Sequence, residues 1–113
     1  MDLYENIQKL MAELDASIHR LRKNGVELAE AEKAYKMELT KEALRLRFED
    51  MPVTLINQIV YGLEEVADLR LKRDSAKANY EANQEHINIC KLKLRILENQ
   101  LSREWNNTRK GEL

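Results

Sequence analysis

The sequence predicts an all-α protein, built as a long antiparallel helical hairpin of the coiled-coil type. Two observations predict this fold class. Apolar residues recur every seven positions, with a second row interleaved at gaps of three and four, in both halves of the chain. A single proline, Pro52, separates the two halves. Because 113 residues suffice for one domain, we expect residues 1–113 to form a single hairpin.

The first helix is predicted over about residues 2–48. Its main heptad row consists of Ile7, Leu14, Leu21, Leu28 and Tyr35. The weakest point is Asn24-Gly25, since glycine often follows the last turn of a helix. However, the heptad row continues without a phase shift, and an interior glycine costs only about 1 kcal/mol relative to alanine. We therefore favour one continuous helix, with a break at Gly25 as the alternative.

The turn is predicted at residues 49–53, because Pro52 lacks an N–H and disfavours helical geometry in the residue before it. Either Asp50 or Thr54 can cap the next helix. That second helix is predicted over about residues 54–106, followed by a frayed polar tail at 107–113.

The second helix continues the heptad pattern and becomes apolar on two faces near its end. Its main row consists of Ile59, Val66, Arg73, Tyr80, Ile87, Leu94 and Leu101. A helix that is apolar on two sides is typical of bundles with three or more helices, so we expect two hairpins to form a homodimeric four-helix bundle. The predicted oligomer seam consists of Ile87, Ile89, Leu92, Leu94, Ile96, Leu97 and Leu101.

In the antiparallel hairpin, residues whose numbers sum to about 103–105 should face each other. A parallel dimer through the second helix is the main alternative. Within the hairpin, Arg73 falls on the seam opposite Glu30 to Glu32, where an ion pair would fix the register. Otherwise its guanidinium would reach solvent along its aliphatic stem.

Residues 51–63 form the most apolar stretch, with more apolar side chains than a two-helix seam can bury, so the rest must cover a neighbouring chain, a folded-back segment or a partner. Trp105 lies beside the last seam position and either caps the bundle or offers a second apolar anchor for a partner. We therefore expect a protein partner to bind at Met51, Val53, Ile56, Val60, Tyr61 and Trp105.

Charge gives little direction toward nucleic acid, because the formal net charge is −1. The basic clusters lack the interleaved aromatic residues of a single-strand-binding groove. Nucleic-acid binding is therefore the alternative function, through Arg45, Arg47, Arg70, Lys72, Lys91, Lys93 and Arg95.

Catalytic and metal-binding patterns are absent from the sequence, so we predict no enzyme, no metal site and no cofactor. His19 and His86 face each other on the hairpin register, but two histidines without a third ligand make a poor zinc site. Cys90, the only cysteine, occupies a seam position and reads as a small core residue. With no signal-like or membrane-spanning stretch, we expect a cytoplasmic protein.

Two segments carry a resemblance to a known group of proteins. They are Met51-Pro52-Val53-Thr54-Leu55-Ile56, with its continuation through Ala76, and Lys91-Leu92-Lys93-Leu94-Arg95-Ile96-Leu97-Glu98, ending at Trp105. These residues resemble small helical accessory proteins from the early regions of temperate phages and prophages of Gram-positive bacteria. The resemblance covers residues 51–105 and implies a non-enzymatic role in the host cytoplasm.

Together these observations predict a protein–protein interaction module. The resemblance implies that its partner is a replication, recombination or host-defence protein. A structural coiled-coil scaffold is a further alternative.

Overall fold

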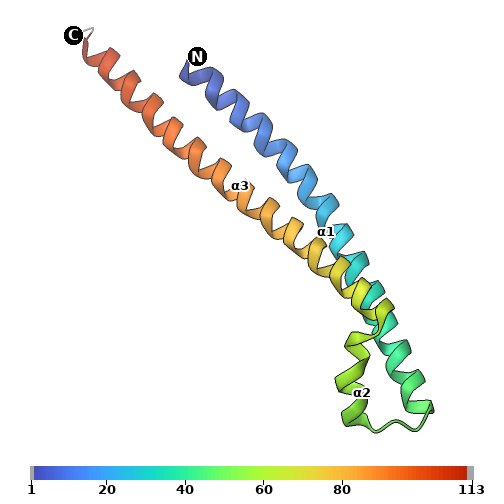
Figure 1. Cartoon of the computed structure of the whole chain (residues 1–113). Helices are drawn as coiled ribbons and strands as arrows, with labels where there is room; N and C mark the ends of the chain where they lie inside the picture. Colours follow the sequence, from blue (N-terminus) through green and yellow to red (C-terminus); the bar gives the residue numbers. More distant parts are fainter. Residues whose placement is uncertain (1, 112–113) are drawn as a thin grey trace. The chain divides into compact units, whose positions relative to one another are not determined.

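The computed structural model describes the backbone of residues 2–111 and the side chains up to residue 108. In chain order these residues form α1 (Leu3–Phe48), α2 (Val53–Ile59), the 3-10 turn η1 (Val60–Gly62) and α3 (Glu64–Gly111) (Figure 1). The long helices α1 and α3 pack antiparallel as a hairpin, and α2 lies in the connection. The all-α hairpin prediction is therefore confirmed. Among the described helices, none is long and apolar enough to cross a membrane.

The chain divides into two packing units. The first unit combines the residues up to Arg22 with those from Ala82 onward. Its buried residues come from alternate heptad rows of α1 and α3: Ile7, Ser17, Asn83, Ile87 and Cys90. The amide Nδ2 of Asn83 donates hydrogen bonds to the Ser17 hydroxyl at 2.9 Å and to the Ser17 carbonyl at 3.0 Å. This buried polar pair joins the two helices across an otherwise apolar seam.

The second unit spans Lys23–Glu81 and holds the tight end of the hairpin. Leu46 at the end of α1 packs with Ile56 and Val60 of the connection. Partly buried apolar side chains surround these three residues: Leu39, Ala43, Met51, Ile59 and Leu63. Farther along the two long helices, Ala31, Tyr35 and Val66 are buried. The apolar excess of residues 51–63 is therefore used largely to cover the end of α1.

α1 passes through Gly25 as one continuous helix, which confirms the predicted course of this segment. A Cβ built at Gly25 would lie in van der Waals contact with the Tyr80 ring, 3.4 Å from its Cε2. Tyr80 therefore packs over the weak point of the heptad row.

α1 ends in a Schellman motif centred on Asp50. The Met51 amide donates to the Leu46 carbonyl, and the Asp50 amide donates to the Arg47 carbonyl. Asp50 adopts the left-handed conformation that this motif requires, with φ of 62°. The prediction that Asp50 or Thr54 caps the next helix is wrong, since the N-cap of α2 is Pro52 and no side chain caps it.

The predicted second helix is not continuous. α2 ends at Ile59, η1 follows, and Leu63 is extended with φ −64° and ψ 135° before α3 begins at Glu64. This break lets Ile56 and Val60 turn onto Leu46. α3 then continues to Gly111, beyond the predicted end at 106, and residues 112–113 of the expected frayed tail lie outside the described residues.

Candidate functional site

The outer face of α3 in the first unit exposes an apolar stripe. It consists of Ile89, Leu92 and Ile96, whose side chains are 42%, 54% and 53% exposed. Their spacing of three and four residues places them on one face of the helix, opposite the seam that contains Ile87 and Cys90. This outer stripe has no partner within the described part of the chain.

The predicted oligomer seam is thus divided between two faces. Ile87 is buried, and Leu94 and Leu97 are half-buried, all on the seam side of α3. Leu101 lies farther along that row and is 40% exposed. The predicted seam residues that keep the exposure needed for pairing between chains are therefore the outer stripe and Leu101.

A second apolar surface lies on the last part of α1. Met37, Leu44 and Phe48 are exposed and line a shallow hollow together with basic and polar neighbours, namely Lys36, Thr40, Lys41 and Arg45. Phe48, at 87%, is almost fully exposed. The sequence pattern does not reveal this surface, because Met37, Leu44 and Phe48 lie outside the apolar stretch 51–63.

The predicted partner residues separate into two groups. Ile56 and Val60 are only 6% and 3% exposed, because they form the core with Leu46, and the prediction that they face a partner is corrected. Met51 is partly buried beside them. The remaining three residues are exposed: Val53, Tyr61 and Trp105.

The basic residues proposed for nucleic-acid binding are all exposed, but they belong to different units. Arg45, Arg47, Arg70 and Lys72 lie in the second unit, whereas Lys91, Lys93 and Arg95 lie in the first. Arg45 is held by Glu42 at 2.7 Å and by Glu49 at 2.9 Å. Arg70 lies over the Tyr61 ring, 5.6 Å from its centroid. Among the basic residues proposed for nucleic-acid binding, Arg70 therefore has an aromatic neighbour, next to the connection between the long helices.

Arg73 lies at the seam, as expected, but it forms an ion pair with Asp74, the next residue in the sequence. Its guanidinium bonds Asp74 at 2.8 Å and lies 4.6 Å from the centroid of the Tyr35 ring. The hydrogen bond to Asp74 raises the pKa of Arg73. The predicted ion pair across the seam is thus replaced by a cation–π contact across it.

Glu38 of α1 and Glu65 of α3 bring two carboxyl groups together in the second unit. Hydrogen bonding with Glu65 raises the pKa of Glu38, and burial raises it further, while Lys41 acts in the opposite direction. Glu42 completes an acidic group of three, and Arg45 binds it. Lys41 and Arg45 therefore already neutralise part of the negative charge of this acidic group.

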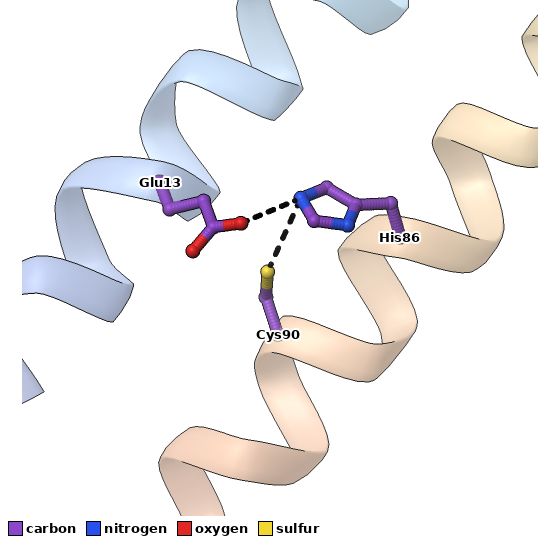
Figure 2. Close-up of side chains that lie close together, drawn as sticks. All are labelled: Glu13, His86 and Cys90. Atoms are coloured by element: carbon purple, nitrogen blue, oxygen red, sulfur yellow. Dashed lines mark hydrogen bonds and ion pairs between the residues drawn. The ribbon is translucent and has the colours of Figure 1, made fainter.

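A histidine, a cysteine and a glutamate meet on one flank of the first unit (Figure 2). His86 Nε2 lies 3.1 Å from Glu13 Oε1 and 3.7 Å from Cys90 Sγ. His86 and Cys90 are one turn apart on α3, whereas Glu13 comes from α1 (Figure 2). The predicted register placed His19 opposite His86, but in the structure it is Glu13 that pairs with His86.

Comparison with protein-family models, with curated proteins and with solved structures found no match.

Proposed function

We propose that this protein is a non-enzymatic interaction module that pairs with a second copy of itself through the outer stripe of α3. The observation that carries this proposal is the apolar exposure of Ile89, Leu92 and Ile96 on the face opposite the hairpin seam. A helix that is apolar on both faces is stabilised when a second helical layer covers the outer one.

A second copy is the occupant that the pattern favours. The stripe has the three-and-four spacing of a helix-packing surface. Two antiparallel copies of α3 would bring their stripes face to face, with Ile89 of one chain opposite Ile96 of the other.

Docking on a different protein is the second part of the proposal. Met37, Leu44 and Phe48 lie together on one stretch of α1, with Lys36, Lys41 and Arg45 beside them. The three basic residues already pair with acidic residues of α1, so the exposed apolar side chains are what this surface offers, and they favour an apolar helical partner segment. The resemblance of residues 51–105 to phage accessory proteins supports a replication, recombination or defence protein as that partner.

Co-purification of two differently tagged copies tests the self-pairing. We expect wild-type copies to be recovered together, and we expect Leu92→Lys to abolish this recovery because it places a charge in the stripe. Leu71→Lys is the matched control, since Leu71 is an exposed leucine on the same helix in the other unit. Recovery of Leu92→Lys copies at the level of the control would contradict the proposal.

A further inference from the structure

We propose that Glu13, His86 and Cys90 form a zinc site that joins α1 and α3 and leaves the fourth coordination position to water. The sequence-based prediction of no metal site considered only the two histidines. That prediction leaves out Glu13 and Cys90, which come together with His86 only in the folded hairpin. This inference is independent of the proposed self-pairing.

The separations of the donor atoms fit tetrahedral coordination. Zinc binds nitrogen and oxygen at about 2.0–2.2 Å and sulfur at about 2.3 Å, so neighbouring donors of one site lie about 3.2–3.6 Å apart. In this structure Glu13 Oε1 and His86 Nε2 are 3.1 Å apart, and His86 Nε2 and Cys90 Sγ are 3.7 Å apart. All three donor atoms lie within 4.8 Å of one another. Small side-chain rotations therefore suffice to place them around one ion.

The chemistry of the three donors favours zinc among divalent ions. A thiolate and an imidazole exclude magnesium and calcium, which prefer sets of oxygen ligands. Thiolate and carboxylate together carry two negative charges, which balance Zn²⁺ when the imidazole is neutral. Binding releases the thiol proton of Cys90 to solvent, so affinity should fall as the pH is lowered.

The position of the cluster gives an ion a way in. Glu13 and His86 side chains are 50% and 39% exposed, whereas Cys90 is only 2% exposed and lies in the seam behind them. A metal ion can thus reach the site from the solvent-facing flank, with sulfur as its inner ligand. The burial of Cys90 also disfavours the competing role of a cysteine nucleophile, which needs access to a substrate.

Because the ligands come from both long helices, zinc should stabilise the folded first unit. An ion that binds the folded state and not the unfolded chain raises the midpoint of thermal unfolding. The same three residues without a metal would form only an interhelical ion pair and a hydrogen bond, and added zinc would then leave the midpoint unchanged.

The test uses the full chain, reduced and freed of metal, with Co²⁺ as a spectroscopic probe and Zn²⁺ as its competitor. We expect one equivalent of Co²⁺ to produce a sulfur-to-cobalt charge-transfer band and tetrahedral d–d bands, and we expect Zn²⁺ to remove both. Zn²⁺ should also raise the midpoint of thermal unfolding. Failure to observe the charge-transfer band would overturn the proposal.

Variants identify the ligands. Cys90→Ser should lose the charge-transfer band, and His86→Gln and Glu13→Gln should each weaken zinc binding by more than about tenfold. His19→Gln is the matched control, because it removes an exposed histidine from the same unit and should bind zinc as the wild type does. Glu13 is half exposed, so Glu13→Gln keeps the test informative if a change at the buried Cys90 prevents folding. Equal zinc affinity in the ligand variants and the control would overturn the proposal.

Discussion

Single polar residues in the seams carry much of the specificity of this hairpin. Asn83 and Ser17 are 8% and 0% exposed and satisfy each other across the first unit. Burying polar groups costs free energy unless they are hydrogen-bonded, so this pair favours the one register that brings the two residues together. Arg73 contacts the Tyr35 ring in the second unit and adds a further polar contact between the helices.

Asn83→Ala should lower the free energy of unfolding by about 1–3 kcal/mol, because it leaves the buried Ser17 hydroxyl without this partner. The double variant Ser17→Ala/Asn83→Leu should lose less, since no polar side chain then remains buried there. Urea denaturation measures both changes. Asn88→Ala, at an exposed position of the same helix, should differ from the wild type by less than about 0.5 kcal/mol. A similar loss in Asn83→Ala and Asn88→Ala would contradict the role of the pair.

The raised pKa of Glu38 predicts that the stability of the folded chain depends on pH. Its pKa is raised in the folded chain, so the folded state binds a proton more tightly than the unfolded state does. The stabilisation is therefore fully present below the unfolded-state pKa and is lost as the pH rises through the folded-state pKa.

Glu38→Gln should raise the thermal midpoint at pH 7 and flatten its decline between acidic and neutral pH, because a neutral amide removes the repulsion with Glu65. Thermal unfolding followed by circular dichroism over this pH range provides the measurement. Glu30→Gln removes an exposed carboxylate from the same helix and should keep the wild-type profile. An unchanged profile in Glu38→Gln would show that the carboxyl pair has no such effect.

At the scale of elements, the sequence predicts α1 well and the second helix only in part. The heptad rows identify α1 to within a residue at both ends, and they correctly continue through Gly25. They also run unbroken from Ile59 to Val66, although the backbone leaves the helix at Leu63. Apolar spacing reports which residues face a core, and the short 3-10 turn preserves that spacing, so periodicity alone does not reveal the break.

The end of α1 depends on one residue with a positive φ. Asp50→Gly should raise the free energy of unfolding by up to about 1 kcal/mol, because glycine adopts the left-handed conformation without a Cβ clash. Asp50→Val should lower it by about 1–2 kcal/mol, because a β-branched side chain tolerates that conformation poorly. Chemical denaturation compares the two variants. Equal stability of the glycine and valine variants would contradict the assigned helix end.

The candidate sites were predicted less completely than the fold. Ile89, Leu92 and Ile96 were found because a helix with two apolar faces is visible in the sequence. The cluster of Glu13, His86 and Cys90 was missed, because the observed pairing in the first unit differs from the predicted register by about one helical turn. An error of one turn leaves the apolar seam intact but exchanges the polar residues beside it, so polar sites depend on the register far more strongly than the core does.

At the scale of the whole molecule, the hairpin buries a narrow seam in each unit and leaves apolar side chains exposed on both long helices. A chain of this composition gains stability by covering such surfaces with another helical layer. The formal net charge of −1 opposes self-association only weakly. We therefore propose that a second copy of the chain covers the exposed stripe of α3.

Sedimentation equilibrium of the wild-type chain over a wide range of concentrations measures this pairing. We expect a molar mass that approaches twice the 13.3 kDa of one chain as the concentration rises. Leu92→Lys should remain at the mass of a single chain with its helical content unchanged. A wild-type mass of one chain at every concentration would contradict self-pairing through α3.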